Sequence, residues 1–207
     1  MTSSGTLLEE KLLFKHKRLM KTCPLIIICV VFMVLTHLVG ATQADDTTIT
    51  ISGKTAGATP FISKLTLQVS NTSVLKSIQF AINPKPGSVT RPLSGTYANF
   101  YLVGRGFVHP PEIILPVYGL YAGYTNIVRL TYRFMDGSSK QAVTAITTAT
   151  FDDRGCGYNN PTRLQPRTNS THLSYDYIFD SAACGGSPTS QGFSPVILDS
   201  DGALRWG

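Results

Sequence analysis

Hydrophobic and polar residues alternate along the chain from Thr47 to Phe151 with a dominant period of two. In the clearest segments, KLTLQVS (64–70), SIQFAI (77–82) and NIVRLTYRF (126–134), aliphatic or aromatic residues recur at every second position. Successive side chains of a β-strand point to opposite faces, so this spacing predicts strands with one buried and one solvated face. No segment of this region has the 3.6-residue period of an amphipathic helix.

Further strands are predicted at residues 47–52, 97–104 and 112–117. The segment MDGSSK (135–140) suits a hairpin turn that leads into QAVTAITTATF (141–151). This gives about seven short strands in about 105 residues, which is the spacing of a two-sheet sandwich. We therefore expect an all-β domain, a β-sandwich of the immunoglobulin or fibronectin III type.

The end of the chain has a second hairpin pattern. Val196 to Leu198 is apolar, Asp201-Gly202 is a turn signal, and Leu204 and Trp206 resume the alternation. The aromatic segment SYDYIFD (174–180) suits one more strand. An exposed strand edge favours aggregation, and the final strand has few residues to pair with. The segment is therefore either a tail or the start of a structure whose other strands are missing.

Composition supports a packed core and gives little hint of a charged partner. Of the 207 residues, 43% are hydrophobic, which is ample for a globular domain. Five of the eighteen basic and two of the twelve acidic residues precede Ala44, which leaves a net charge of +3 from Asp45 onward. No basic stripe with interleaved aromatic residues is present, so the sequence does not predict a nucleic-acid partner.

The amino-terminal segment has the pattern of a secretory signal. Lys15 to Lys21 is basic, PLIIICVVFMVL (24–35) is an uncharged apolar run, and GATQA (40–44) supplies small residues for cleavage. The apolar run is shorter than the roughly 18–20 residues that span a bilayer. We therefore predict a signal peptide at residues 1–44.

Two details of this signal stay open. Cleavage after Ala44 and cleavage after Ala41 both fit the small-residue rule, and Met20 is an alternative translation start. The predicted protein is exported, to the periplasm or beyond the cell, and would contact a membrane only through this segment. An uncleaved amino-terminal anchor is the alternative interpretation.

Cysteine usage agrees with export. Cys23 and Cys29 lie in the predicted signal, which leaves Cys156 and Cys184 in the mature chain, both in turn-forming segments of the polar region 152–192. In an oxidising compartment such a pair most simply forms one disulfide. Zinc is the alternative, but a structural zinc site needs four ligands, and the mature chain adds only two histidines.

No group of residues indicates catalysis. The sequence has no glycine-rich phosphate loop, no G-x-S-x-G motif and no paired metal ligands. His109 precedes two prolines and is interpreted as a structural loop residue, while His172 has no neighbouring carboxylate or nucleophile that would mark a triad. Asp152 and Asp153 suit a solvated turn better than a cation site. The sequence therefore predicts no catalytic, cofactor-binding or metal-binding residue.

The most distinctive segment is PVYGLYAGYTNIVRL, from Pro116 to Leu130. It combines a strand end, a bend at Gly119 and three tyrosines ahead of the next strand. A packed aromatic corner, which sandwich domains commonly contain, accounts for it physically.

This segment also resembles the amino-terminal β-sandwich of the bacterial aryl-sulfate sulfotransferases. The family has an NP…PL segment, a PV-[aromatic]-GLY-x-x-Y-x-N-x-V signature and a DG hairpin. The matching residues here are Asn83-Pro84, Pro92-Leu93, Pro116, Val117, Tyr118, Gly119, Leu120, Tyr121, Tyr124, Asn126, Val128 and Asp136-Gly137.

The resemblance implies a β-propeller after the sandwich. In the family the first blade begins with a D-x-DG-x-[VL]-RW pattern, which here is Asp199 to Trp206. We therefore expect four parts, namely a signal (1–44), the sandwich (45–151), a cysteine-containing loop region (152–192) and the first strand of a missing propeller (193–207). Since its blade partners would be absent, the resemblance implies that the final strand is unpaired and mobile.

The resemblance further implies sulfuryl transfer between phenols through a histidine of the propeller, without a cofactor. None of those propeller residues can be placed on this sequence. Phenols and phenolic sulfate esters are therefore expected partners only of a chain that contains the propeller, and a homo-oligomer remains open. The alternative is a self-sufficient secreted binding or adhesion module, with the tyrosine-rich corner as its contact surface.

The predicted disulfide can be tested directly. A Cys156–Cys184 bridge closes a loop of about 29 residues and stabilises the fold by about 3.5 kcal/mol in the chain-entropy model. Thiol labelling of exported, non-reduced protein should therefore detect no free cysteine. Two labelled thiols would refute the bridge.

Overall fold

The computed structural model describes residues 46–153, 155–162, 164, 167–169, 175–180 and 195–207. These residues belong to one compact unit, Ala44–Gly207. The predicted signal, Cys184 and His172 lie outside the described residues. Within the part that is described, no helix is long and apolar enough to cross a membrane.

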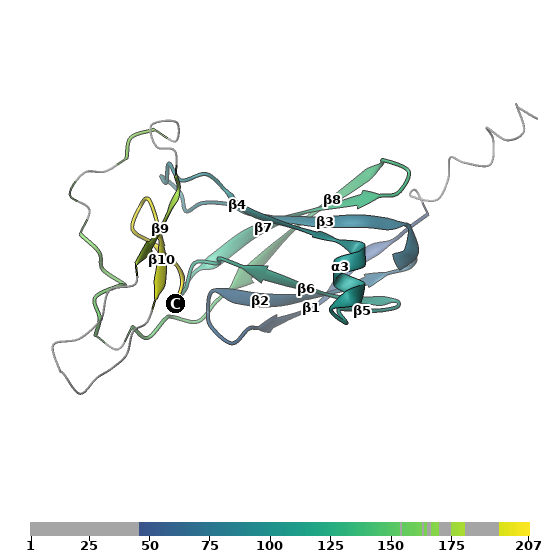
Figure 1. Cartoon of the computed structure of the whole chain (residues 1–207), viewed down its shortest axis with the longest axis horizontal. Helices are drawn as coiled ribbons and strands as arrows, with labels where there is room; N and C mark the ends of the chain where they lie inside the picture. Colours follow the sequence, from purple (N-terminus) through teal and green to yellow (C-terminus); the bar gives the residue numbers. More distant parts are fainter. Residues whose placement is uncertain (1–45, 154, 163, 165–166, 170–174, 181–194) are drawn as a thin grey trace, which may run out of the picture. The chain divides into compact units, whose positions relative to one another are not determined.

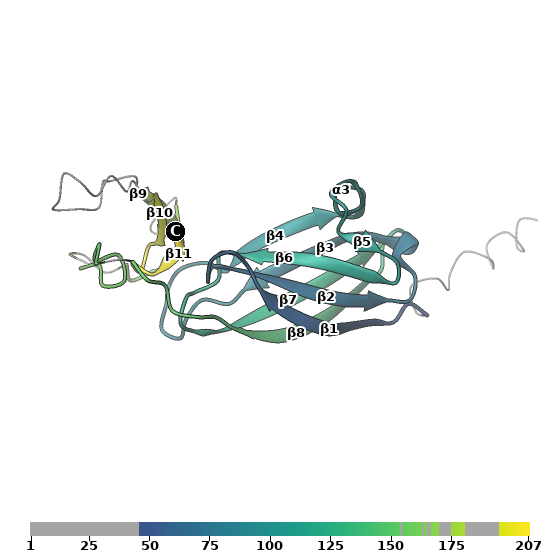
Figure 2. The ribbon, with the colours of Figure 1, turned by 90° about the horizontal axis from the view of Figure 1, so that it is seen from below.

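Two four-stranded antiparallel sheets form the body of the fold (Figures 1 and 2). The strand order of the first sheet is β1-β2-β6-β5, with β1 at Ile49–Ala56, β2 at Ile62–Val69, β5 at Val108–His109 and β6 at Glu112–Tyr118. The strand order of the second is β4-β3-β7-β8, with β3 at Leu75–Ile82, β4 at Leu93–Ala98, β7 at Thr125–Phe134 and β8 at Ser139–Thr147. A 3₁₀ turn, η1 (Thr72–Val74), precedes β3. The predicted β-sandwich is confirmed.

The core lies between the two sheets and follows the sequence alternation. Leu65, Leu67 and Val69 of β2 are buried, as are Ile78 and Phe80 of β3. The same holds for every second residue of β7 from Val128 to Phe134. Because a one-residue slip would move each of these side chains to solvent, the alternation fixes the register of the strands.

The predicted strand at 97–104 is wrong over most of its length. Strand β4 ends at Ala98, and the short helix α3 (Asn99–Gly104) follows it. The backbone N–H of Arg105 donates to the carbonyl of Tyr101, and that of Phe107 donates to Leu102. A six-residue helix that buries only Leu102 is too short to show helical periodicity in the sequence.

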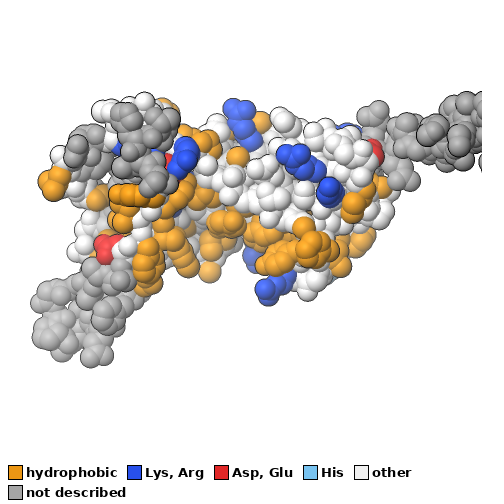
Figure 3. Space-filling model, turned by 45° about the horizontal axis from the view of Figure 1, so that its top comes forward, with side chains coloured by type: hydrophobic (Ala, Val, Ile, Leu, Met, Phe, Trp, Pro, Cys, Tyr) orange, Lys and Arg blue, Asp and Glu red, His pale blue; other side chains and the backbone are white. Residues whose placement is uncertain are grey.

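Helix α3 also leaves apolar side chains in solvent. Phe100, Val103 and Tyr101 are 81%, 56% and 42% exposed. Figure 3 shows hydrophobic side chains gathered in patches on one face of the molecule, with lysine and arginine side chains scattered between them. The exposed apolar surface of the sandwich is therefore partly made by this helix.

A third, three-stranded sheet follows the sandwich, and we call it the terminal sheet. Its strands are β9 (Tyr177–Asp180), β10 (Val196–Asp199) and β11 (Leu204–Trp206), in the order β11-β10-β9. The predicted hairpin at the chain end is confirmed, and SYDYIFD supplies β9 as expected. The expectation of an unpaired final strand is wrong, because β11 pairs with β10 through Ile197 and Trp206.

The turn between β10 and β11 explains this pairing. One carboxylate oxygen of Asp199 accepts hydrogen bonds from the backbone N–H groups of Asp201, at 3.0 Å, and Ala203, at 2.9 Å. Gly202 has φ +81°, a conformation that glycine adopts without a steric penalty. The turn is therefore closed by residues of the chain itself, and β11 needs no further strand in order to pair.

A small second core joins the terminal sheet to the sandwich. Phe61 precedes β2 and is fully buried together with Val196 of β10, and Leu204 of β11 is 7% exposed in the same cluster. The ring of Phe151, after β8, lies with its centroid 5.0 Å from that of Phe61. The terminal sheet therefore packs on apolar residues that flank the strands of the sandwich.

Candidate functional site

The signature segment folds into a corner between β6 and β7, and Asn126 holds it together. The side chain of Asn126 is fully buried. Its Oδ1 accepts from the N–H of Tyr121 at 2.8 Å, and its Nδ2 donates to the carbonyls of Tyr121, at 3.0 Å, and Tyr124, at 3.1 Å. A third carbonyl, that of Ile146 on β8, lies at 3.4 Å. One amide side chain thus satisfies backbone groups of the corner that water cannot reach.

Neighbouring contacts fix the corner to the end of β8. The Thr148 hydroxyl donates to the carbonyl of Tyr121 at 2.6 Å, and the Gly123 N–H donates to Ala149 at 2.7 Å. The ring of Tyr124 meets that of Tyr121 edge-on, with 5.7 Å between centroids. The corner is therefore a packed structural element.

Gly119 begins the corner and allows close approach of other residues. Its φ is +76°, and a Cβ at this position would lie 2.4 Å from Cδ1 of Leu93. Any side chain here would be strained and would also displace Leu93. The other signature residues lie nearby: Pro116 and Val117 are in β6, and Leu120 is buried in the main core.

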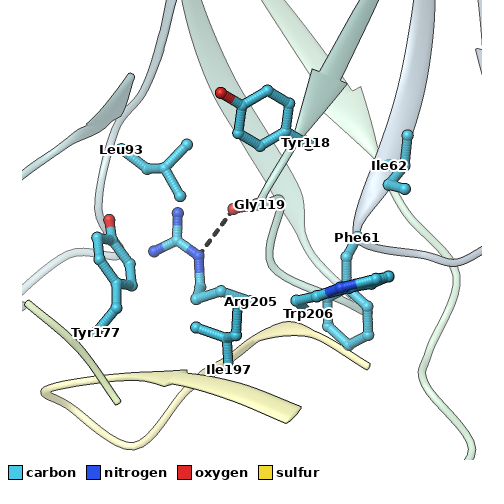
Figure 4. Close-up of a pocket in the computed structure, with 9 residues that line it drawn as sticks. All are labelled: Phe61, Ile62, Leu93, Tyr118, Gly119, Tyr177, Ile197, Arg205 and Trp206. Carbon is cyan, nitrogen blue, oxygen red and sulfur yellow. Dashed lines mark hydrogen bonds between the residues drawn. The ribbon is translucent and has the colours of Figure 1, made fainter. Parts of the chain in front are cut away.

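The Gly119 carbonyl accepts a hydrogen bond from a buried arginine of the terminal sheet. Nε of Arg205 lies 2.8 Å from this oxygen, and Arg205 is only 2% exposed (Figure 4). One terminal nitrogen of Arg205 is 3.3 Å from the fully buried carboxylate of Asp199. The guanidinium carbon lies 3.8 Å from the ring centroid of Tyr121, which is a close cation–π contact.

A second ion network joins the terminal sheet to the loop between β3 and β4. Asp176, 8% exposed, accepts from Arg167 at 2.8 Å and forms an ion pair with Nε of Arg91. Arg167 also donates to the Ser200 hydroxyl at 2.8 Å. Burial opposes ionisation of Asp176, but the hydrogen bonds from Arg167 and Arg91 outweigh it and lower the pKa of that carboxyl below its usual value.

The same loop contacts the hairpin turn. The hydroxyl of Thr90 donates to the carboxylate of Asp201 at 2.9 Å, and the Ser88 hydroxyl donates to the same oxygen. Thr90 is 3% exposed. The β3–β4 loop and the β10–β11 turn are therefore joined by hydrogen bonds between residues more than a hundred positions apart in sequence.

Gly119 and Arg205 also line an apolar cavity of about 440 Å³ (Figure 4). Its lining from the sandwich is Phe61, Ile62, Leu93, Tyr118 and Gly119, and its lining from the terminal sheet is Tyr177, Ile197, Arg205 and Trp206. Such a volume is within the range of small-molecule pockets. Tyr118 and Trp206 are 44% and 41% exposed, so the cavity reaches solvent beside them.

Within the part of the chain that the structure describes, two polar atoms of the cavity residues are buried without a hydrogen-bond partner, one terminal nitrogen of Arg205 and the hydroxyl of Tyr177. Burial raises the pKa of Tyr177, and the same effect raises the pKa of Tyr121 beside the guanidinium. Both phenols are therefore protonated at neutral pH and can donate hydrogen bonds.

The other residues that the sequence singled out lie elsewhere. His109 is exposed at the end of the edge strand β5. Asp153 caps a turn by accepting from the N–H groups of Gly155 and Asn159, which agrees with the solvated-turn interpretation. Cys156 lies half-buried in this turn, and its pairing with Cys184 stays a prediction. Among the described residues, no group of three histidine, cysteine or acidic side chains is placed to hold a metal ion.

Sequence analysis did not identify the Arg91, Arg167 and Asp176 network. Arg91 and Asp176 are 85 positions apart, and each stands in an ordinary polar loop context. No local pattern could have paired them. Arg205 belongs to the D-x-DG-x-[VL]-RW pattern, but nothing in the sequence indicates that its charge is buried.

We expect replacement of Asn126 by alanine to destabilise the sandwich. It leaves at least two buried backbone groups unsatisfied, which costs about 3 kcal/mol in the free energy of unfolding. Chemical denaturation of Asn126→Ala measures this loss. Asn160→Ala, at an exposed position, is the matched control and should change the free energy by no more than about 0.5 kcal/mol.

The lowered pKa of Asp176 predicts how stability depends on pH. A carboxyl whose pKa is lower in the folded chain contributes stability above its unfolded pKa, and this is lost as pH falls through the folded value. The stability difference between the unmodified chain and Asp176→Asn should therefore be constant near neutrality and shrink below about pH 4. Denaturant titrations at a series of pH values measure it, and parallel curves for the two proteins would contradict the assignment.

Comparison with known protein families gives a match over the sandwich. Residues 62–149 match the family model described as the arylsulfotransferase Ig-like domain, which covers the sandwich from β2 to just past β8. No curated protein matches the chain.

Proposed function

Because residues 62–149 form an arylsulfotransferase Ig-like domain, we propose that this chain is the amino-terminal, non-catalytic module of an exported arylsulfotransferase. Its task is mechanical. The sandwich holds the sheet that follows it in a fixed position, so that strands added to that sheet begin from a defined place.

The buried Arg205 carries this proposal. Its hydrogen bond to Gly119 joins the last strand to the corner that contains the family signature. An apolar contact alone would allow the terminal sheet to slide along the corner. A buried guanidinium must instead keep its hydrogen-bond geometry, because otherwise its charge is no longer compensated. The hydrogen bond between Arg205 and Gly119 therefore supports a role in positioning.

A non-catalytic role agrees with the chemistry of the described residues. Sulfuryl transfer through a covalent intermediate needs a nucleophile beside positive groups that stabilise charge developing on oxygen. The described histidine, His109, is exposed on β5 and belongs to no ion network given above. The buried arginines Arg167 and Arg205 contact the carboxylates Asp176 and Asp199. These contacts suit a structural role for the two arginines, and catalysis would require other residues.

Export is the second part of the proposal. It rests on the basic and apolar pattern of residues 15–44 and on a cysteine pair suited to an oxidising compartment. The mature protein would be periplasmic or secreted.

The tyrosine-rich corner does not favour the alternative of a separate binding module. Tyr121 is 1% exposed, and the backbone around it is occupied by Asn126 and Thr148. A contact surface at this corner would offer Tyr118 and part of Tyr124, and Tyr118 already belongs to the cavity wall.

We expect the purified chain to transfer no sulfate between phenols. The assay incubates it with an aryl sulfate donor and a phenolic acceptor and compares product formation with the uncatalysed rate. His109→Ala and His172→Ala serve as controls. Turnover well above background that either substitution abolishes would contradict the non-catalytic role and place an active site in this chain.

A further inference from the structure

We propose that helix α3 and the basic side chains around it form a surface that binds an anionic lipid bilayer. The exposed aromatic and aliphatic side chains of the helix enter the bilayer surface, and the basic side chains contact the lipid headgroups. The inference goes beyond the positioning role of the sandwich. It also differs from the expectation that the chain contacts a membrane only through its amino-terminal segment.

The apolar side chains of α3 are the first observation. Phe100 is 81% exposed, and Tyr101 and Val103 are exposed as well, whereas Leu102 packs in the core. Half of this six-residue helix is therefore apolar surface in contact with solvent. Exposed apolar side chains that gather in a patch between polar ones are typical of an interaction site.

Contacts with the sandwich hold this patch in place. Nδ2 of Asn99 donates to the carbonyl of Thr72 at 3.2 Å. The ring of Tyr101 stacks on that of Tyr97, with 6.0 Å between centroids, and the guanidinium carbon of Arg105 lies 5.4 Å from the Tyr101 centroid. In Figure 2 the helix projects from the edge of the sandwich. A projecting patch suits a bilayer surface, which deforms around it, whereas a protein partner would need a matching hollow.

The charge of the sandwich favours an anionic bilayer over a neutral one. Residues 47–151 contain nine basic and two acidic residues, a net charge of +7. Residues 152–207 contain four basic and six acidic residues, a net charge of −2. The moderate net charge of the region from Asp45 onward is therefore the balance of a strongly basic sandwich and an acidic carboxyl-terminal part. Such charge asymmetry is a sign of interaction with a polyanion or a membrane.

Three of the basic residues lie close to the helix. Arg105 follows its last residue directly. Ala98, which precedes the helix, pairs with Ser77 of β3, and Ser77 pairs in turn with Arg133 of β7. Lys76 is the neighbour of Ser77 in β3, and all three basic side chains are exposed. The apolar patch is therefore flanked by positive charge.

The two acidic residues of the sandwich lie outside α3 and have polar partners. Glu112 accepts from the side-chain amide of Gln68 at 3.4 Å, and Asp136 accepts from the N–H and the hydroxyl of Ser138 within its own turn. Figure 3 shows lysine and arginine side chains around the hydrophobic patches of this face and few acidic ones. Basic side chains beside an apolar patch attract the headgroups of anionic lipids.

Vesicle binding tests the apolar patch and the charge. We would mix the purified chain with vesicles of phosphatidylglycerol and phosphatidylcholine, or of phosphatidylcholine alone, and measure the bound fraction by sedimentation. Binding should be stronger to the anionic vesicles and should fall as salt is added. Phe100→Ser should weaken it roughly tenfold, because one immersed ring is lost. Phe179→Ser, at a 65% exposed position of β9 in the acidic part of the chain, is the matched control and should leave binding unchanged.

Tryptophan quenching locates the contact itself. Phe100→Trp and Phe179→Trp each add one tryptophan to the native Trp206, whose signal in the unmodified chain gives the baseline. In anionic vesicles with brominated acyl chains, Phe100→Trp should be quenched beyond this baseline and Phe179→Trp should not. An amino-terminal segment that holds the chain on the vesicle acts on both variants alike, so it cannot produce this difference. Circular dichroism checks that both variants fold.

The outcomes separate clearly. No quenching of Phe100→Trp beyond the baseline, or equal quenching in the two variants, would overturn the membrane contact. Equal binding to charged and neutral vesicles would overturn the role of the basic side chains. A dimer that Phe100→Ser converts to a monomer in light scattering without lipid would assign the patch to a second copy of the chain instead. Sulfuryl transfer plays no part in these measurements, so their result is independent of the proposed function.

Discussion

The buried guanidinium of Arg205 is the constraint on which the junction of sandwich and terminal sheet depends. A charge removed from water is tolerated only when hydrogen bonds and an opposite charge compensate it. Three groups from two elements supply that compensation: the Gly119 carbonyl and the face of the Tyr121 ring in the corner, and the Asp199 carboxylate at the end of β10. All three must be in place at once, so these contacts restrict the position of the terminal sheet.

The rest of the local structure holds those three partners still. Asn126 fixes the corner that presents Gly119 and Tyr121, and the Asp199 side chain also closes the turn that sets β10 against β11. Apolar burial around Phe61 favours association of the two surfaces in general, because the hydrophobic effect is non-directional. The ion pairs, which depend on the orientation of their groups, restrict how the two surfaces can associate. This combination suits the proposed positioning role.

The cavity lies at the same junction. Aromatic rings from the sandwich and from the terminal sheet line it, and one nitrogen of Arg205 and the Tyr177 hydroxyl are buried without a hydrogen-bond partner among the described residues. Native proteins keep few such atoms.

The sequence by itself determined the sandwich, because burial of one strand face imposes a period of two that survives in Leu65, Leu67, Val69 and their counterparts in β3 and β7. It also determined the turn at Asp201-Gly202 and the corner at Gly119, where backbone geometry restricts the residue type. Only the tertiary structure decided the rest. Helix α3 is too short to leave a helical period, and the partners of Arg91 and Arg205 depend on contacts between residues far apart in the sequence, which no local pattern records.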